Sequence, residues 1–263
     1  MVVVILALVL MALACGCTDG GTGPEVTATF DEKYRANEKT VVSVENPTGS
    51  VTITRGDVRD VVLHVVKRSR AGAEELEKVE ISATKGDLLK IRAKWTSVLP
   101  PRVTVDMAIT VPPYVTVDAV TVSNGDVRIE ETKGDVSVSC FNGDVFIRDV
   151  DGSVVAAVEN GDLEVRETTG IGDLSVKNGA IEAEVRDIDR DVVIEGEGGD
   201  IVLAMGPSLD AILSVATKNG VVSVEGLDLE VGPTGTDATG VLGAGIYRLT
   251  VECTNGDVNL TAL

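Results

Sequence analysis

Aromatic residues make up only 3% of this 263-residue chain, and histidine occurs once, at position 64 in a run of aliphatic residues. We interpret His64 as a surface or hydrogen-bonded side chain, because without a second histidine neither a hydrolase triad nor a histidine-based metal site is expected. A glycine loop that cradles phosphate is also missing, since such a loop precedes a helix and the sequence offers hardly any helix. The sequence therefore nominates no catalytic residue, no metal ligand and no cofactor.

Positive charge is scarce as well. The chain has 23 Lys and Arg against 42 Asp and Glu, and its formal net charge of −19 is carried downstream of residue 17. Nucleic acid is excluded as a partner, because its phosphate backbone is bound through basic side chains. We interpret the negative charge as a source of solubility.

Hydrophobic residues form 44% of the chain, and valine and isoleucine dominate among them. Such β-branched residues suit pleated strands rather than helices. Only residues 73–79 suggest a helix, of two turns at most. The composition therefore predicts an all-β protein of one or two domains that is long enough to bury a substantial core.

The first 14 residues are an unbroken apolar run that is too short to span a bilayer comfortably as a helix. Small residues and cysteine follow, as in a lipoprotein signal peptide whose cysteine becomes acylated. Cys17 is preferred over Cys15 because a glycine precedes it and a polar stretch follows it. We expect a signal peptide over residues 1–16 and a flexible tether over residues 17–24. No Lys or Arg occurs near the start, so a plain secretory signal or an uncleaved anchor stays an alternative.

One phrase, Asn-Gly-Asp followed by an aliphatic residue, recurs at constant spacing in the second half of the chain. It begins at Asn124, Asn142, Asn160 and Asn178, with Ala in place of Asp in the last copy, so its period is 18 residues. Weaker Gly-Asp copies, such as the one at Gly134, fall about halfway between. A fixed period of this size is typical of a repeat architecture.

Apolar and polar residues alternate within each repeat, so that Val136, Val138 and Cys140 share one face. Period-two alternation indicates strands with one buried face. An antiparallel meander with Asn-Gly hairpins and a solenoid with two strands per coil both fit half-repeats of this length. The meander would need another layer over its apolar face, whereas the two sheets of a solenoid cover each other. We therefore predict a parallel β-solenoid (β-helix) with about 18 residues per coil, with Asn and Gly at corners because both tolerate positive φ.

The two halves of the chain differ in regularity. Residues 25–117 read as longer strands, and we expect this N-terminal β region to be continuous with the repeat solenoid of residues 118–263. The period loosens after residue 203, where a Gly/Thr-rich insertion covers residues 231–245. The phrase then returns at Asn255, close to the end of the chain.

Cys140 and Cys253 occupy the same inward slot of their repeats, two residues before an asparagine. Several coils at roughly 4.8 Å each would separate them, beyond the limit of about 7 Å for a disulfide. We predict that both are buried free thiols.

The aspartates of the phrase would stack about 4.8 Å apart, where like charges repel unless something offsets them. Calcium does so in β-rolls with coils of this length, but that motif needs Gly-Gly-x-Gly-x-Asp, and each turn here has one glycine directly before its aspartate. The alternative, which we prefer, is that each carboxylate accepts hydrogen bonds from turn N–H groups. The stacked residues are Asp126, Asp144 and Asp162 at one corner and Asp135 and Asp173 at the other.

The two outer faces of such a solenoid would differ in character. On the sheet that follows the Asn-Gly-Asp turns, charged side chains point outward, and we expect Glu130 to pair with Arg148 and Arg166 with Glu184. The other face is flat, small-residued and nearly uncharged over its first two coils. Such a patch is either covered by the N-terminal half of the chain or used to bind. The candidate binding face consists of Ser137, Ser139, Val155, Ala157 and Ser175.

Several motifs follow one another along the chain in a recognisable order. After the lipoprotein-like leader come Asn-x-x-Gly-Ser-Val-Thr-Ile from Asn46, Ile-Thr-Val-Pro-Pro from Ile109, the repeats, and Leu-Thr-Val-x-x-Thr-Asn-Gly-Asp-Val from Leu249. In this order the sequence resembles the putative adhesin family, envelope-associated β-repeat domains of bacteria and archaea, over about residues 26–263. The resemblance implies a β-repeat fold and an envelope location, and it brings no catalytic motif.

These observations predict a non-enzymatic, lipid-anchored adhesin-like module that binds or has a structural role on the extracytoplasmic side of the cell envelope. Its partners would be the membrane, through the lipid anchor, and a surface polymer or protein ligand. Two other functions stay open. A metal titration would identify a calcium-stabilised β-roll protein, and glycan degradation would identify a carbohydrate-active β-helix enzyme.

Overall fold

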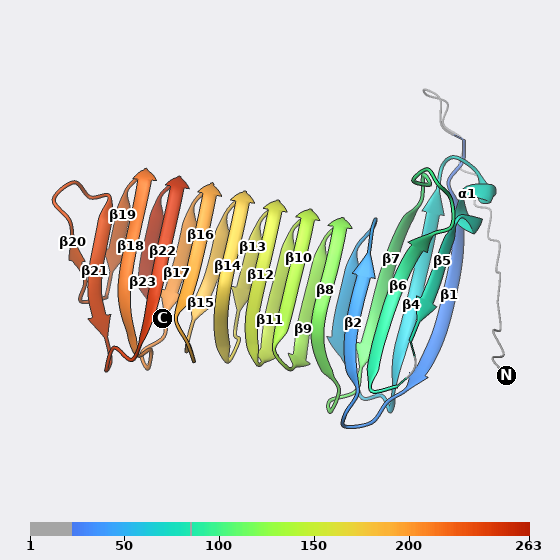
Figure 1. Ribbon diagram of the computed structural model, residues 1–263, viewed down its shortest axis with the longest axis horizontal. Helices are drawn as coiled ribbons and strands as arrows, with labels where there is room; N and C mark the ends of the chain where they lie inside the picture. Colours follow the sequence, from blue (N-terminus) through green and yellow to red (C-terminus); the bar gives the residue numbers. More distant parts are fainter. Residues whose placement is uncertain (1–22, 85) are drawn as a thin grey trace.

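The computed structural model describes residues 23–84 and 86–263. The chain forms two long β-sheets that face each other (Figure 1), and apolar side chains fill the space between them. Sheet A has 11 strands and sheet B has 12. Within the described residues, α1 (Ala73–Glu77) is the one α-helix, where the sequence predicted a helix. None of the helical structure described is long and apolar enough to cross a membrane.

Regular coils form the centre of the molecule, each with one strand in sheet B followed by one in sheet A. Their strands are β8 (Thr116–Asn124), β9 (Val127–Lys133), β10 (Val136–Asn142), β11 (Val145–Asp151), β12 (Ser153–Asn160), β13 (Leu163–Arg166), β14 (Gly170–Asn178), β15 (Ile181–Val185), β16 (Val192–Gly198) and β17 (Ile201–Met205). Neighbouring strands are parallel and in register one period apart, as Ser137 with Val155 and Val127 with Val145. The predicted parallel β-solenoid with two strands per coil is confirmed.

The N-terminal half extends both sheets beyond the first repeat coil. Its strands are β1 (Val26–Arg35), β2 (Val41–Asn46), β3 (Val51–Arg55), β4 (Asp60–Ser69), β5 (Val79–Ala83), β6 (Leu88–Trp95) and β7 (Thr104–Val111). The coil of β2 and β3 lies between the coil of β8 and β9 and the strands β6 and β7, all parallel. The outermost strands β1, β4 and β5 pair antiparallel, which ends the parallel stack on this side.

The C-terminal end departs from sequence order. Its strands are β18 (Ala211–Asn219), β19 (Val222–Glu225), β20 (Glu230–Val231), β21 (Asp237–Leu242), β22 (Tyr247–Asn255) and β23 (Val258–Ala262). The last coil of the chain, β22 and β23, lies between the coil of β16 and β17 and the coil of β18 and β19. The insertion after residue 231 supplies β21, which pairs antiparallel with β18.

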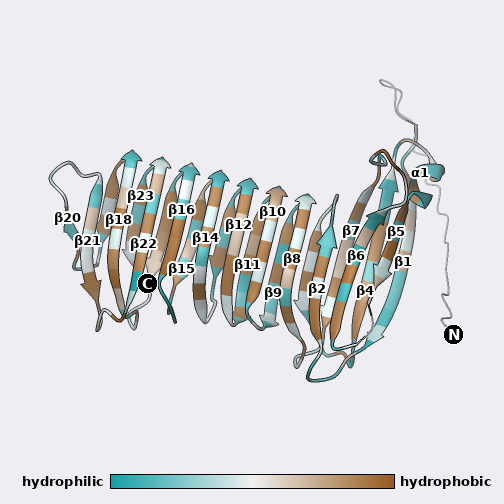
Figure 2. Cartoon of the chain, viewed as in Figure 1, coloured by the Kyte–Doolittle hydropathy of each residue, from teal (hydrophilic) through white to brown (hydrophobic). Residues whose placement is uncertain are grey.

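Alternation along each strand sends apolar side chains into the space between the sheets. Val136 and Cys140 are 1% exposed, whereas Ser137 and Ser139 between them are exposed. Figure 2 shows the resulting bands of hydrophobic and hydrophilic residues along the strands. Inward residues of successive coils stack on one another, as Cys140 does between Val122 and Val158 in register.

Glycine is required at the corner that joins sheet B to sheet A. Gly143 has a φ of 141°, and an added Cβ would lie 2.3 Å from the carbonyl oxygen of Gly125 in the preceding coil. The same approach repeats at Gly161 and Gly179. The corner asparagines do not share this conformation, because the described non-glycine residues with positive φ are Glu131, Asp149 and Glu167. The predicted reason for asparagine was therefore wrong.

Candidate binding face

The outer face of sheet B presents the residues nominated from the sequence. Ser137 lies beside Val155, and Ala157 lies between Ser139 and Ser175. Ser137, Ser139 and Ala157 are exposed, and the other two are half-buried. The N-terminal half of the chain lies beside these residues in the same sheet instead of over them. Of the two outcomes expected for this patch, the structure shows the exposed one.

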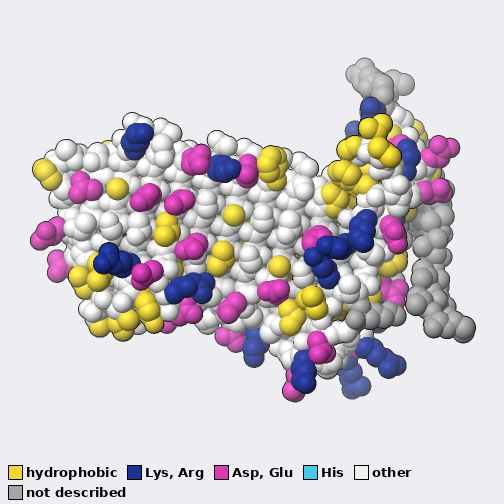
Figure 3. Space-filling model, in the orientation of Figure 1, with side chains coloured by type: hydrophobic (Ala, Val, Ile, Leu, Met, Phe, Trp, Pro, Cys, Tyr) yellow, Lys and Arg dark blue, Asp and Glu magenta, His cyan; other side chains and the backbone are white. Residues whose placement is uncertain are grey.

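The face continues beyond the nominated residues and is bordered by charge. On β8, Ala119 and Thr121 lie in register with Ser137 and Ser139. Figure 3 shows this side of the molecule, where a broad band over the central strands has little charge. Its distal border includes Glu195, beside Ser175 in β14.

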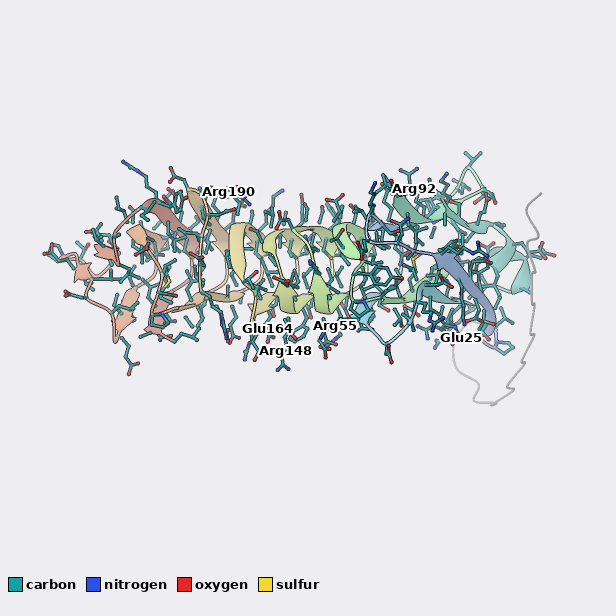
Figure 4. All side chains as sticks on the ribbon, turned by 90° about the horizontal axis from the view of Figure 1, so that it is seen from below. Glu25, Arg55, Arg92, Arg148, Glu164 and Arg190 are labelled. Atoms are coloured by element: carbon teal, nitrogen blue, oxygen red, sulfur yellow. The ribbon has the colours of Figure 1, made fainter. Side chains whose placement is uncertain are left out.

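A small cluster of charged residues forms the border on the N-terminal side. Arg92 donates to Glu45 across β2 and β6, with Nη2 and Oε1 3.1 Å apart, and Lys90 also contacts Glu45. The hydrogen bond from Arg92 holds the pKa of Glu45 below its usual value, with a further contribution from Lys90. In Figure 4, Arg92 projects from one face of the two-sheet body, and Arg55 and Arg148 project from the opposite face.

The outer face of sheet A is charged as predicted, but its ion pairs differ from the predicted ones. Arg148 lies in register with Glu130, yet its Nε lies 2.7 Å from Oε2 of Glu167. Glu167 has a φ of 53° and leaves the alternation of the strand, which brings its carboxylate to Arg148. The predicted pair of Arg166 with Glu184 is likewise not formed. The ion pairs found are Arg128–Glu130, Arg148–Glu167, Arg166–Glu164, Arg166–Glu182 and Arg186–Glu184.

The aspartates at the Asn-Gly-Asp corner are hydrogen-bonded from coil to coil. Asp144 N–H donates to Oδ1 of Asp126 at 3.0 Å, and Asp162 N–H donates to Oδ1 of Asp144 at 2.9 Å. The next donor is the N–H of Ala180, 2.8 Å from Oδ1 of Asp162. Each carboxylate therefore gains a backbone donor that offsets part of the repulsion between neighbours.

The opposite corner uses the same contact. Ser153 N–H donates to Oδ1 of Asp135, and Val193 N–H donates to Oδ1 of Asp173, each at 2.9 Å. Across residues 23–84 and 86–263, no group of three or more His, Cys, Asp or Glu is placed to hold a metal ion. The turn-amide alternative to calcium is the arrangement that the structure shows.

Asparagine side chains form a second ladder, which the sequence reasoning missed. Asn142 Nδ2 donates to Oδ1 of Asn124 at 2.8 Å, and the same bond of 2.9 Å joins Asn160 to Asn142 and Asn178 to Asn160. Stacked amides of this kind stabilise parallel in-register strands. The constant 18-residue spacing of asparagine itself was the signal that could have predicted the ladder.

The histidine and the two described cysteines are structural. Nδ1 of His64 lies 2.6 Å from Oδ1 of Asp31 on the surface of β1 and β4. Cys140 and Cys253 are buried free thiols, as predicted. Burial raises the pKa of Cys140 to about 11, with the charges of Asp126 and Asp144 adding to the effect. A thiol that stays protonated is a poor nucleophile.

Two further points concern the N-terminal half. The signal peptide with Cys15 and Cys17 lies outside the described residues, as does the tether up to residue 22. The sequence reasoning did not single out the loop of residues 96–103, in which Val98 and Leu99 are 102% and 77% exposed. The signal that could have found it is two aliphatic residues directly before two prolines, where no strand buries them.

Comparisons with known proteins follow this geometry. A family model described as Toastrack DUF4097 matches residues 25–261, which confirms the family resemblance seen in the sequence. No curated protein sequence matches the chain.

Several solved structures are similar to the chain at low identity. A putative adhesin from Bacteroides fragilis is 14% identical, with a TM-score of 0.39, and the match covers 89% of this chain and 97% of that one. A putative adhesin from Parabacteroides distasonis is 11% identical, with a TM-score of 0.40, and the match covers 92% of this chain and 98% of that one. A putative cell adhesion protein from Clostridium sporogenes is 12% identical, with a TM-score of 0.36 and coverage of 90% and 100%.

Proposed function

We propose that this chain, which belongs to the Toastrack DUF4097 family, is a non-enzymatic, adhesin-like module that is lipid-anchored outside the membrane. The outer face of sheet B binds its partner. The observation that carries this function is the exposure of the candidate binding face, which lies on a flat, regular sheet and is left uncovered by the N-terminal half.

The architecture suits presentation of a surface. Twelve strands in one sheet, spaced by roughly 4.8 Å, extend about 50 Å from the end that holds the start of the described chain. Hydrogen bonds from coil to coil at the corners hold neighbouring strands in one register. A pre-ordered surface loses less conformational entropy on binding than a flexible one.

The chemistry of the face limits the kind of partner. Hydroxyl groups of Ser137, Ser139 and Ser175 stand beside the aliphatic side chains of Val155 and Ala157, with no charged residue among them. Such a face fits a neutral surface polymer or a flat protein surface, which it contacts by apolar packing and hydrogen bonds.

The anchor is the acylated Cys17 or Cys15. One acyl chain gives marginal, reversible membrane binding, so at least two are expected on the mature protein. The mass of the mature N-terminus and the membrane fraction test this part. A Cys15→Ser/Cys17→Ser variant that stays in the membrane fraction would show that the leader is a plain hydrophobic anchor.

Placing arginine at Val155 and Ala157 together tests the binding face. We expect unchanged thermal stability and lost attachment of cells that display the protein to polysaccharide-coated or protein-coated surfaces. The matched control is Val202→Arg/Ala204→Arg, which changes the same two residue types at half-buried outward positions of sheet A. Lost stability would mean that the patch packs internally, and no change in stability or attachment would refute the binding face.

A further inference from the structure

An apolar tip stands at the N-terminal end of the solenoid, made of Trp95, Val98, Leu99 and Pro100. Trp95 is 39% exposed, and Val98 and Leu99 are almost wholly exposed. In Figure 3 the hydrophobic side chains gather near the upper ends of β5 and β6, beside basic residues. Adjacent large apolar side chains in water mark an interaction site.

Hydrogen bonds order the loop that carries the tip. Thr96 N–H donates to the carbonyl of Lys78 at 2.8 Å, and Ser97 Oγ donates to the carbonyl of Leu99 at 2.7 Å. Arg102 N–H donates to Oε2 of Glu75 in α1 at 3.0 Å. The apolar side chains are thus held outward by a loop whose polar groups bond back to the body of the protein.

The tip lies next to the start of the described chain. Val26 pairs with Ser69, and Ser69 Oγ donates to the carbonyl of Arg102 at the base of the loop, 2.8 Å away. From Cys17 to Val26 the chain can extend by roughly 30 Å at most. A lipid on Cys17 would therefore keep the tip close to the membrane surface.

Charge separates this end of the molecule from the rest. Residues 60–103 contain nine Lys and Arg against six Asp and Glu, whereas residues 104–263 contain nine against 29. Lys78 and Arg102 line the depression beside the loop, and Lys94 directly precedes Trp95. Basic residues are attracted to anionic lipid headgroups, and Trp favours the membrane–water interface.

We propose that the apolar tip inserts into the surface of an anionic lipid bilayer and seats the solenoid on the membrane by its N-terminal end. This inference rests on the membrane anchoring proposed above and adds a second contact to it. The acidic repeats are repelled by the same headgroups, so the solenoid points away from the bilayer and its sheet B face stays free.

Trp95 is the single tryptophan of the chain, so its fluorescence reports on the tip alone. The test uses the acylated full-length protein in phosphatidylcholine vesicles with and without phosphatidylglycerol, and with lipids brominated near the headgroup. We expect a blue shift and quenching of Trp95 fluorescence that are at least about two-fold stronger in the anionic vesicles. Vesicle flotation, measured on the same samples, reports on anchoring independently of the tip.

Two variants separate the apolar and the electrostatic parts of the contact. Val98→Ser/Leu99→Ser should lose about half or more of the quenching while flotation persists, because the lipid still anchors the chain. The matched control is Val241→Ser/Ile246→Ser, which changes two aliphatic residues of 57% and 62% exposure at the other end of the molecule. Lys94→Gln/Arg102→Gln should remove the preference for anionic vesicles.

Protein that floats with the vesicles without quenching of Trp95 would overturn the tip and leave the anchor intact. Protein that neither floats nor shows quenching would overturn the anchor as well. Quenching of equal strength in both kinds of vesicle would overturn the electrostatic contact. A blue shift that grows with protein concentration in the absence of vesicles would assign the tip to a second copy of the chain instead.

Discussion

Gly143 lies where two successive coils approach most closely. With Gly143→Ala, the new Cβ would overlap the carbonyl oxygen of Gly125 in a conformation with φ of 141°. We expect a loss of at least about 3 kcal/mol in the free energy of unfolding, measured by urea denaturation, because both strain and a backbone clash are introduced.

A matched variant separates the two causes. Gly86 has a φ of 131°, and an added Cβ would meet no atom within 4 Å. Gly86→Ala should therefore cost only about 1–2 kcal/mol, the contribution of backbone strain. Equal losses for the two variants would show that the close approach of the coils is not what requires glycine at Gly143.

Two buried threonines lack hydrogen-bond partners. The hydroxyl oxygens of Thr132 and Thr168 are buried without a partner, and in the coil between them Val150 fills the corresponding position. Because an unsatisfied buried hydroxyl costs about 1–3 kcal/mol, Thr132→Val should raise the free energy of unfolding by roughly 1 kcal/mol, measured by thermal or urea denaturation.

The control for this prediction is an exposed threonine in the same fold. Thr121 lies on the outer face of β8, so Thr121→Val should change stability by less than about 0.5 kcal/mol. A destabilised Thr132→Val variant would mean that the hydroxyl finds a partner, such as a water molecule, that valine cannot replace.

A coil is the structural element that the chain repeats. It places one strand in each sheet and returns the backbone to the same corner after 18 residues, so that Asn142 meets Asn160 and Gly143 meets Gly161. The ladders of Asn and Asp run across coils and never within one. Each coil therefore depends on its neighbours for both its core and its corner hydrogen bonds.

Deleting residues 142–159 removes one whole coil, and the chain should still fold, with a shorter solenoid. Deleting only residues 142–150 should destabilise it far more, because a strand built for sheet B would then enter sheet A with its faces out of phase. Circular dichroism and melting temperature of the two deletions measure this difference. Equal melting behaviour would contradict a structural unit of 18 residues.

The whole molecule has one coil out of sequence order at each end. The connection from β7 to β8 passes the coil of β2 and β3, and the connection from β17 to β18 leaves a gap that β22 and β23 later fill. The coil of β18 and β19 meets the central solenoid only through that last coil. Residues 211–263 are therefore expected to fold as one unit, after the end of the chain is available.

Ending the chain after Ile246 tests this interdependence. We expect residues 211–231 to lose amide protection in hydrogen exchange, while residues 127–205 keep theirs, because the latter pair with each other. In a solenoid stacked in sequence order, removing the last coil would leave all earlier coils protected. Protection retained over residues 211–219 would show that β18 can replace β22 beside β16.

The coil could be predicted because its determinants are local. Alternation of residues such as Val136, Ser137 and Val138 decides which side of a strand is buried, and the 18-residue spacing sets the length of a coil, whatever lies elsewhere in the chain. The buried free thiols followed from the same spacing. The ion-pair partners of Arg148 and Arg166 could not be predicted, since long side chains on a hydrated face can reach several neighbours.

The sequence by itself determined the period, the two strands per coil, the inward residues and the glycine corners. Only the tertiary structure decided the order in which coils stack, because the phrases at Asn219 and Asn255 present nearly the same strand edge to a neighbour. Pairing of β18 with both β21 and β22 selects one arrangement. The tertiary structure likewise decided that the candidate face and the apolar tip are exposed. Exposure depends on where distant segments pack, and neither period nor composition carries that information.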